Sequence, residues 1–298
     1  MILKLNIIKK HSKKIHKMTF NKRTRQNSKQ INKKCNKQRG DFTEIIYGKN
    51  ACCGCFNGYA NGIYNREIYG IYILQSRFDE YYKQVPTELR KFVKQCNSHD
   101  MFVLTHEQDK HQGIAVKASA FKFLTIEELI EKLEEKKDKN KNSKSSIFVL
   151  DCVQDPQNVG NIIRTAFCFG VDAIILTSHN TCGITSSVVR ASAGYSECSL
   201  MCQVNNLVND LSKLKQLGYW IIGFDVNTNT TDNLPLLVEK YDKCIFIFGS
   251  EGQGMKDLTK KTCDIIIKLP MAQGAESLNV ANTATIVGWE IMKNKQQK

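Results

Sequence analysis

Two patterns of apolar and polar residues divide the chain near residue 146. Beyond that point, short unbroken apolar runs are separated by longer stretches with helical spacing. Five runs are clear, at 147–153, 173–177, 219–224, 244–249 and 265–269, and a weaker sixth covers 199–204. Strands that are apolar on both faces are typical of a parallel sheet with helices on each side. The pattern therefore predicts an α/β domain over 147–298, with a parallel sheet and helices on both faces.

Residues 41–122 have a mixed pattern that predicts a second, smaller α/β domain. Apolar runs at 68–74 and 101–104 are rich in β-branched and aromatic residues, which favour strands. The segment 87–95 follows Pro86, and proline suits the start of a helix, so a helix is predicted there.

The segment 123–146 joins the two domains. Thr125 and Glu128 form a capping-box pair at the start of an apolar stripe with helical spacing, which predicts a helix. The stripe ends in the run 134–146, which has no apolar residue, and this polar run is interpreted as a solvated linker.

The net charge of +14 comes from one end of the chain. Residues 1–40 hold eleven Lys and three Arg but no acidic residue, so the other 29 basic residues are matched by 29 acidic ones. An acid-free basic N-terminus with apolar residues at its start is typical of an organellar transit peptide, and we predict a mitochondrial location on this basis. The alternatives are another organelle or, if the arm is a polybasic tail that holds RNA phosphates, the nucleus or the cytoplasm.

Neither a membrane span nor a metal site is expected. No stretch approaches the roughly 20 consecutive apolar residues that a transmembrane helix needs. The twelve cysteines are scattered, and without a signal peptide free thiols are the default. Cys52 and Cys55 form a C-x-x-C pair, but His99 and His106 do not complete a second pair at zinc spacing.

Three loops that follow predicted strands carry candidate chemistry, because parallel sheets bind ligands at the carboxyl ends of their strands. The first contains Asn158, which can cap a helix, and Arg164 nearly two turns later. The second, 249–255, has three glycines that allow close backbone approach to a ligand. The third, 269–282, carries Ser277 and Asn279 at the start of a predicted helix over 277–292. Taken singly, each loop is equally consistent with ordinary surface or turn chemistry.

Together, the three loops resemble the three motifs of the SpoU (TrmH-like) family of RNA ribose 2′-O-methyltransferases. The motif N-x-G-x-x-x-R-T is matched by 158–165, G-[AS]-E-G-x-G-M by 249–255, and I/L-P-M…S-L-N-V by 269–280. Residues 46–119, including His111-Gln112-Gly113, resemble the substrate-binding domain of the large-subunit ribosomal RNA branch, and Ser192-Ala193-Gly194 matches a further segment. The resemblance implies a trefoil knot in the sheet domain, S-adenosylmethionine as cofactor, and guanosine in ribosomal RNA as substrate.

The resemblance also implies roles for individual residues. The implied catalytic residues are Arg164, Asn158, Glu251, Ser277 and Asn279. The implied cofactor-binding residues are Gly249, Leu269, Leu278, Ser250, Gly252 and Met271, with no metal. The family proposal makes Arg164 the base. Because an arginine is almost never neutral at pH 7, we favour a guanidinium that grips a phosphate and stabilises the emerging alkoxide.

Other functions and the oligomeric state follow from the same residues. A tRNA ribose methyltransferase shares the three loops, whereas a non-catalytic ribosome-assembly factor would not need the complete catalytic set. A nucleotide-dependent oxidoreductase would need a G-x-G-x-x-G fingerprint that the sequence lacks. The predicted helix at 277–292 is apolar on more than one side, which together with the resemblance predicts a homodimer.

Overall fold

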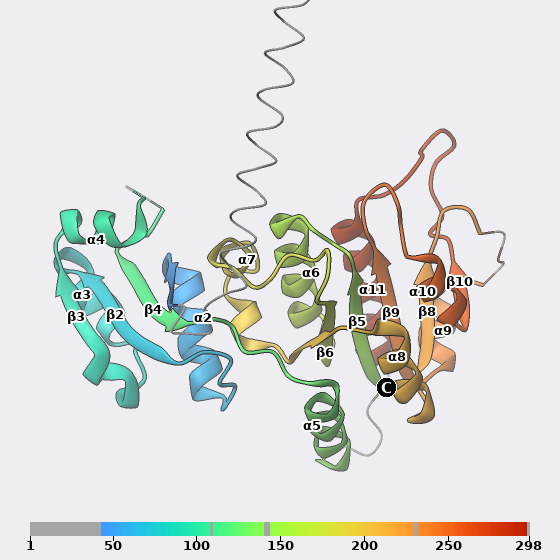
Figure 1. Cartoon of the computed structure of the whole chain (residues 1–298), viewed down its shortest axis with the longest axis horizontal. Coiled ribbons are helices and arrows are strands. Elements are labelled where there is room, and N and C mark those ends of the chain that lie inside the picture. The colour runs from blue at the N-terminus through green and yellow to red at the C-terminus, as the bar shows by residue number, and fades with distance from the viewer. Residues whose placement is uncertain (1–42, 108–109, 140–143, 229, 231, 297–298) are drawn as a thin grey trace, which may run out of the picture. The chain divides into compact units, whose positions relative to one another are not determined.

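The computed structural model describes residues 43–296 except 108–109, 140–143, 229 and 231 (Figure 1). The basic arm predicted at 1–40 lies outside these residues. Within the described part, no helix is both long and apolar enough to cross a membrane.

The larger sheet has six strands, all parallel, in the order β10-β8-β9-β5-β6-β7. Its strands are β5 (Ser145–Asp151), β6 (Ala173–Thr177), β7 (Met201–Val204), β8 (Trp220–Phe224), β9 (Lys243–Gly249) and β10 (Ile265–Ile267). The strand β7 corresponds to the weak sixth run. The predicted parallel sheet is therefore confirmed.

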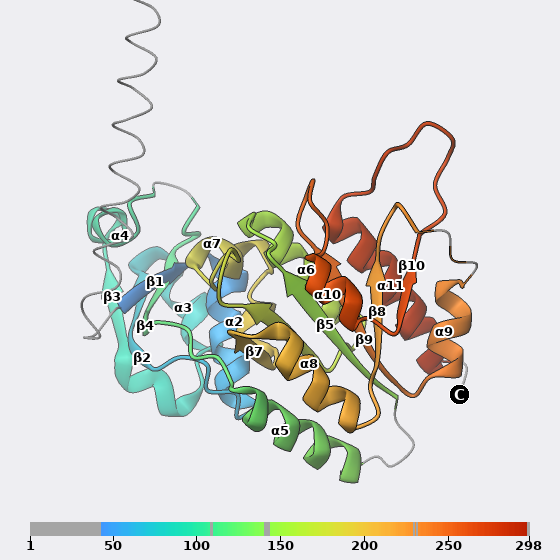
Figure 2. The ribbon, with the colours of Figure 1, turned by 45° about the vertical axis from the view of Figure 1, so that its right-hand side comes forward.

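Helices cover both faces of this sheet (Figures 1 and 2). Phe148 and Phe246 pack with the helices of one face, which are α6 (Pro156–Cys168), α7 (Ser186–Ala191), α9 (Leu234–Lys240) and α11 (Val280–Gln296). Ile147 and Ile245, their neighbours along the strands, pack with α5 (Ile126–Lys139) and α8 (Leu207–Gln216) on the other face. A further short helix, α10 (Asp257–Thr262), follows β9. Because every central strand is buried on both sides, its sequence is an unbroken apolar run.

The smaller sheet has four strands in the order β1-β4-β2-β3. Its strands are β1 (Thr43–Tyr47), β2 (Ile68–Leu74), β3 (Val93–Cys96) and β4 (Ile114–Ser119). The first face packs against α2 (Lys49–Ala60), α3 (Phe78–Tyr82) and the 3₁₀ helix η2 (Thr87–Phe92), and η1 (Gln75–Arg77) leads into α3. The second face packs against α4 (Ser98–Thr105), whose buried Met101 contacts it.

Two predictions for the smaller domain are wrong. The run 101–104 is part of helix α4 and not a strand, because the Asn97 side chain accepts a hydrogen bond from the Asp100 N–H (2.9 Å) and starts a helix there. The predicted helix at 87–95 is instead the 3₁₀ helix η2 followed by β3, which pairs with β2. Apolar runs this short do not distinguish a strand from a buried helical turn.

The capping box at the start of α5 is confirmed. The Thr125 N–H donates to Glu128 Oε2 (2.8 Å), and the Glu128 N–H donates to Thr125 Oγ1 (3.2 Å). The helix runs to Lys139, so part of the polar run assigned to a linker is helical. The polar residues at the end of α5 can remain helical because the apolar stripe that packs on the sheet lies earlier in the helix.

The buried side chain of Arg66 connects the two domains. Arg66 Nε lies 3.1 Å from Glu197 Oε1, and Arg66 Nη1 lies 3.0 Å from Glu44 Oε2. Arg66 Nη2 donates to the Ile184 carbonyl (2.8 Å). Burial raises the pKa of the Glu197 carboxyl, and the neighbouring guanidinium opposes that shift. Fixed hydrogen bonds to both sides of Arg66 hold the smaller domain against the 3₁₀ helix η3 (Tyr195–Cys198) of the larger one.

Candidate catalytic and cofactor site

The three candidate loops meet at the carboxyl edge of the larger sheet. They follow β5, β9 and β10, and β5 and β9 are neighbours in the sheet. Parallel strands all end at the same edge, so segments more than 100 residues apart in sequence lie together there.

A hydrogen-bonded triangle connects one residue from each loop. Asn158 Nδ2 donates to Glu251 Oε1 (2.6 Å), and Asn279 Nδ2 donates to the same oxygen (3.0 Å). Asn279 Nδ2 also lies 3.2 Å from Asn158 Oδ1. Asn158 is only 7% exposed, so its amide needs such partners. The Glu251 carboxylate thereby holds two amides in fixed orientations.

Local sequence explains why Asn158 is in place. Asp155 caps α6 by accepting a hydrogen bond from the Gln157 N–H (3.2 Å), and Pro156 occupies the first turn. A Cβ on Gly160 would lie 2.3 Å from the Ala191 Cβ on α7. The glycine in the first motif therefore allows α6 and α7 to pack in direct contact.

Asn279 has a second function at the start of α11. Its Oδ1 accepts a hydrogen bond from the Ala281 N–H (2.9 Å), as an N-cap side chain does. The helix begins at Val280, three residues later than the predicted start at Ser277. The same side chain therefore both starts the helix and joins the triangle through its other atom.

The glycine-rich turn after β9 is closed on itself. The Ser250 N–H donates to the Gly254 carbonyl (3.0 Å), and the Gly254 N–H donates to the Ser250 carbonyl (2.9 Å). A Cβ on Gly249 would lie 2.2 Å from the Gly254 carbonyl carbon. Glycine is required at the base of the turn because any side chain would collide with its backbone.

Asp151, a carboxylate at the end of β5 that is 1% exposed, was not among the predicted site residues. Its Oδ2 accepts a hydrogen bond from the Lys256 N–H (3.1 Å), directly beyond the glycine-rich turn. Asp151 thus ties the second motif to the strand that leads into the first. A charged residue inside an otherwise apolar run was the signal that could have identified it.

The loop after β8 was also missed, and it lies between the other loops because β8 pairs with both β9 and β10. Asp225 Oδ2 lies 2.6 Å from Lys260 Nζ, and this contact lowers the pKa of the carboxyl. Thr228 Oγ1 donates to the Ile266 carbonyl (3.4 Å). The edge formed by β8, β9 and β10 therefore has three adjacent loops in which a ligand can meet backbone groups.

The remaining predicted residues have no hydrogen bond to the triangle in the described part of the chain. Arg164 is exposed on α6, and Ser277 is exposed in the loop before α11. The predicted cofactor residues flank the same edge, with half-buried Leu269, Met271, Gly249 and Ser250 and exposed Gly252 and Leu278. Their exposure leaves backbone and side-chain groups available to a ligand.

The segment His111-Gln112-Gly113 forms a turn before β4 in the smaller domain. His111 Nδ1 accepts a hydrogen bond from the Gly113 N–H (2.9 Å). Gln112 Oε1 accepts from the Lys49 N–H (2.8 Å) at the start of α2. These contacts connect β4 to α2, so the tripeptide has a structural function.

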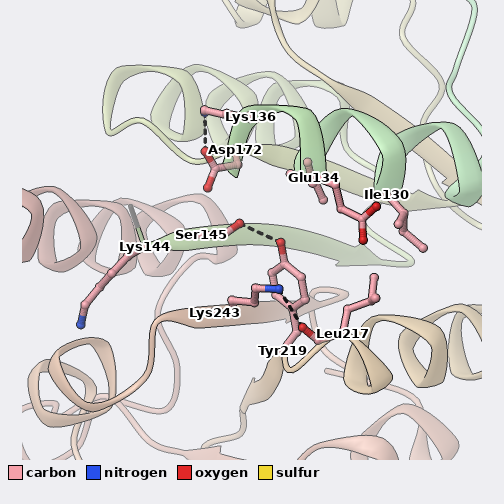
Figure 3. A pocket seen from close by; sticks show the side chains of 10 residues that line it. Ile130, Glu134, Lys136, Lys144, Ser145, Asp172, Leu217, Tyr219 and Lys243 are labelled. Carbon is pink, nitrogen blue, oxygen red and sulfur yellow. Dashed lines mark hydrogen bonds and ion pairs between the residues drawn. The ribbon is translucent and has the colours of Figure 1, made fainter. Parts of the chain in front are cut away.

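A separate pocket lies at the opposite, amino edge of the sheet (Figure 3). Ser145 Oγ lies 2.8 Å from the Tyr219 hydroxyl, and Lys243 Nζ donates to the Leu217 carbonyl (2.7 Å). Burial raises the pKa of Tyr219 to about 12. Because β5 and β9 begin here and end at the triangle, this pocket is not part of the candidate site.

Sequence comparison identifies the larger domain. Residues 145–289 match the model of the SpoU rRNA Methylase family. A putative TrmH family tRNA/rRNA methyltransferase of Bacillus subtilis is 32% identical over 191 residues, which cover 62% of this chain and 72% of that protein. The chain belongs to the SpoU family of RNA methyltransferases. A second family member, from Staphylococcus epidermidis, is 31% identical over 218 residues, covering 70% of this chain and 84% of its own.

Solved structures agree with this SpoU fold. The Streptomyces viridochromogenes methyltransferase AviRb, in complex with the cofactor AdoMet, gives a TM-score of 0.66 at 17% identity, covering 86% of this chain and 91% of its own. An AdoMet-bound rRNA methyltransferase from Sinorhizobium meliloti gives a TM-score of 0.64 at 19% identity, covering 84% of this chain and 87% of its own. Both matches extend beyond the residues of the family model, so they include much of the smaller domain as well.

Proposed function

We propose that this SpoU family member transfers a methyl group from S-adenosylmethionine to the ribose 2′-hydroxyl of a guanosine in ribosomal RNA. The observation that carries the proposal is the Asn158–Glu251–Asn279 triangle, which joins the three family motifs at one edge of the sheet. A protein that only bound RNA would not need this set of fixed amides.

The residues at the edge fit the methyl donor. Backbone groups of Gly249, Leu269 and Leu278 would hold its adenosine part, and Ser250, Gly252 and Met271 would line the same loops. The turn closed by Ser250 and Gly254 presents backbone rather than side chains, as close binding of a flat ring requires. S-adenosylmethionine supplies a methyl group that its sulfonium already makes electrophilic, so the reaction needs no metal.

The protein residues then act mainly by position. Transfer requires the 2′-oxygen, the methyl carbon and the sulfur to lie in line, and fixed neighbours reduce the entropic cost of that alignment. We assign to Asn158, Glu251, Ser277 and Asn279 the orientation of the ribose and of Arg164. Arg164 grips the adjacent phosphate and stabilises the alkoxide as the 2′-proton leaves to a phosphate oxygen.

The smaller domain supports ribosomal RNA as the substrate. We assign residues 41–122 to RNA binding, 123–146 to the connection, and 147–298 to a catalytic domain with a trefoil knot. Residues 1–40 are assigned to a mitochondrial transit peptide. The main competing function is methylation of tRNA by the same loops, since relatives carry the name tRNA/rRNA methyltransferase.

The role of Arg164 is tested by substitution. We expect Arg164→Ala to lower methyl transfer to a ribosomal RNA fragment by about 100-fold, the loss typical of one positioned charge donor. Affinity for S-adenosylmethionine, measured by calorimetry, should change little. Lys240→Ala is the control and should leave transfer unchanged, because Lys240 is an exposed cation at the end of α9, at the amino edge of the sheet and away from the site. Wild-type turnover in Arg164→Ala would remove the role given to this residue.

A further inference from the structure

The smaller sheet has a partly uncovered face that combines an aromatic ring with two lysines. Along β2, Ile71 and Ile73 pack into the core formed with α2 and α3, so Tyr72 points to the opposite face. Lys94 pairs with Tyr72 across β2 and β3, and Lys117 pairs with Gly70 across β2 and β4. Paired residues of neighbouring strands share a face, so both lysines lie on the same side as Tyr72.

Helix α4 covers only one end of this face. Its Met101 packs with Tyr47 and Ala115, where β1 ends and β4 begins. In Figures 1 and 2, α4 lies at one end of β2 and β3. Lys94 is exposed, and Tyr72 and Lys117 are half-buried. The part of the face beyond α4 therefore remains accessible.

Tyr72 lies flat because position 70 is glycine. A Cβ on Gly70 would be 3.0 Å from the Tyr72 ring. Lys94 Nζ lies 5.9 Å from the centre of the same ring. The ring therefore packs on backbone with one ammonium group over it, and a base that stacked there would displace Lys94 toward the adjoining phosphate.

Two carboxylates, those of Asp100 and Glu107, lie at the end of this face that α4 covers. Glu107 Oε1 accepts a hydrogen bond from the Tyr47 hydroxyl (3.4 Å), and the Asp100 charge acts on Cys96. Glu67 accepts a hydrogen bond from the Tyr69 hydroxyl (3.2 Å) at the start of β2. Glu44 on β1 pairs with Arg66. In the part of the chain that the structure describes, none of these carboxylates forms an ion pair with Lys94 or Lys117.

We propose that Tyr72, Lys94 and Lys117 form a platform on which the smaller domain stacks one unpaired base of single-stranded RNA. The ring takes the base, and the two lysines meet the flanking phosphates. Aromatic stacking does not depend on base identity, so the platform recognises an unpaired nucleotide and not a sequence. The inference rests on the proposed function only for its choice of RNA as the partner.

The test is binding and cross-linking of an oligouridylate that carries 4-thiouridine, with the full-length protein. We expect a photo-adduct on the peptide containing Tyr72. Tyr72→Leu should bind about tenfold more weakly, and Tyr72→Phe, which keeps the ring, should bind as the wild type does. Tyr64→Leu is the matched control, because Tyr64 is an exposed tyrosine of the same domain that packs on Tyr59.

The lysines are tested by salt dependence. Lys94→Gln should reduce the slope of log affinity against log salt by about 0.7, the contribution of one phosphate contact to a single strand. Lys83→Gln, which changes an exposed lysine beside α3, should leave the slope unchanged. Adducts confined to other peptides, together with unchanged affinity in Tyr72→Leu or Lys94→Gln, would overturn the platform. Methyl transfer is measured separately: adduct formation without transfer would contradict the proposed function and leave the platform intact.

Discussion

At the residue scale, substitutions of Asn279 can distinguish its capping of α11 from its proposed role in catalysis. Its Oδ1 caps α11, and its Nδ2 donates to Glu251 and Asn158. Aspartate caps helices as well as asparagine does but has no amide donor. Asn279→Asp should therefore keep the cap of α11 while placing a second carboxylate against Glu251.

We expect Asn279→Asp to lower turnover by about 10- to 100-fold, the equivalent of losing a hydrogen bond to a charged group. Its free energy of unfolding, measured in urea at pH 7, should fall by about 1–3 kcal/mol because two carboxylates then face each other, and part of this loss should be recovered at a pH low enough to protonate one of them. Asn279→Ala is the comparison, because it loses the cap without adding a carboxylate and should be about 1 kcal/mol less stable than the wild type. Wild-type turnover in Asn279→Asp would show that the triangle has no part in catalysis.

At the scale of elements, the contact between α6 and α7 depends on a missing side chain. A Cβ on Gly160 would collide with the Cβ of Ala191, so Gly160→Ala should destabilise the protein by about 1–3 kcal/mol. Helix propensity alone predicts the opposite sign, since alanine is favoured over glycine by about 1 kcal/mol. The free energy of unfolding of Gly160→Ala, measured in urea, distinguishes these two expectations.

Two further variants control this prediction. Ala191→Gly combined with Gly160→Ala removes the colliding atom and should recover part of the lost stability. Gly288→Ala on α11 should cost less, because its nearest neighbour is the edge of the Phe169 ring, which can shift. A Gly160→Ala protein more stable than the wild type would mean that α6 and α7 are not closely packed.

The helices and strands also show which parts of the structure could be predicted from the sequence. Unbroken apolar runs predicted the central strands of the larger sheet, because those strands are buried on both faces, whereas the edge strand β7 gave only a weaker run. The short run 101–104 was misassigned because its state depended on the Asn97 cap and on packing of Met101 against distant Tyr47. The site was predictable as three motifs, but no pattern contained the Asp151 contact with the Lys256 N–H, which depends on tertiary structure.

At the scale of the whole molecule, exposed apolar side chains on α6 and α11 support the predicted homodimer. Phe167, Ile286 and Trp289 are each more than 40% exposed. Sedimentation should give twice the chain mass of 33.9 kDa, and Trp289→Glu should shift the protein to the monomer. Trp220→Glu, at a similarly exposed tryptophan on β8, is the control. A 33.9 kDa wild-type species at micromolar concentration would contradict the dimer.

The basic arm at 1–40 gives the other prediction at this scale. If it is a transit peptide, a reporter fused to residues 1–40 should enter mitochondria, and trimming the arm should hardly change the salt dependence of RNA binding. If the arm binds RNA instead, even about six phosphate contacts would steepen the slope by roughly 4–5. A reporter that stays in the cytosol or enters the nucleus, with such a change in slope, would exclude the mitochondrial assignment.

The central proposal is ribose methylation of ribosomal RNA, and mapping of 2′-O-methyl positions tests it most directly. Ribosomal RNA and tRNA from cells that lack this protein are compared with the same RNAs after incubation with pure protein and S-adenosylmethionine. We predict that incubation adds one 2′-O-methyl guanosine to ribosomal RNA, and that Arg164→Ala does not add it. Methylation of tRNA alone, of a base instead of a ribose, or of neither RNA would contradict the proposal.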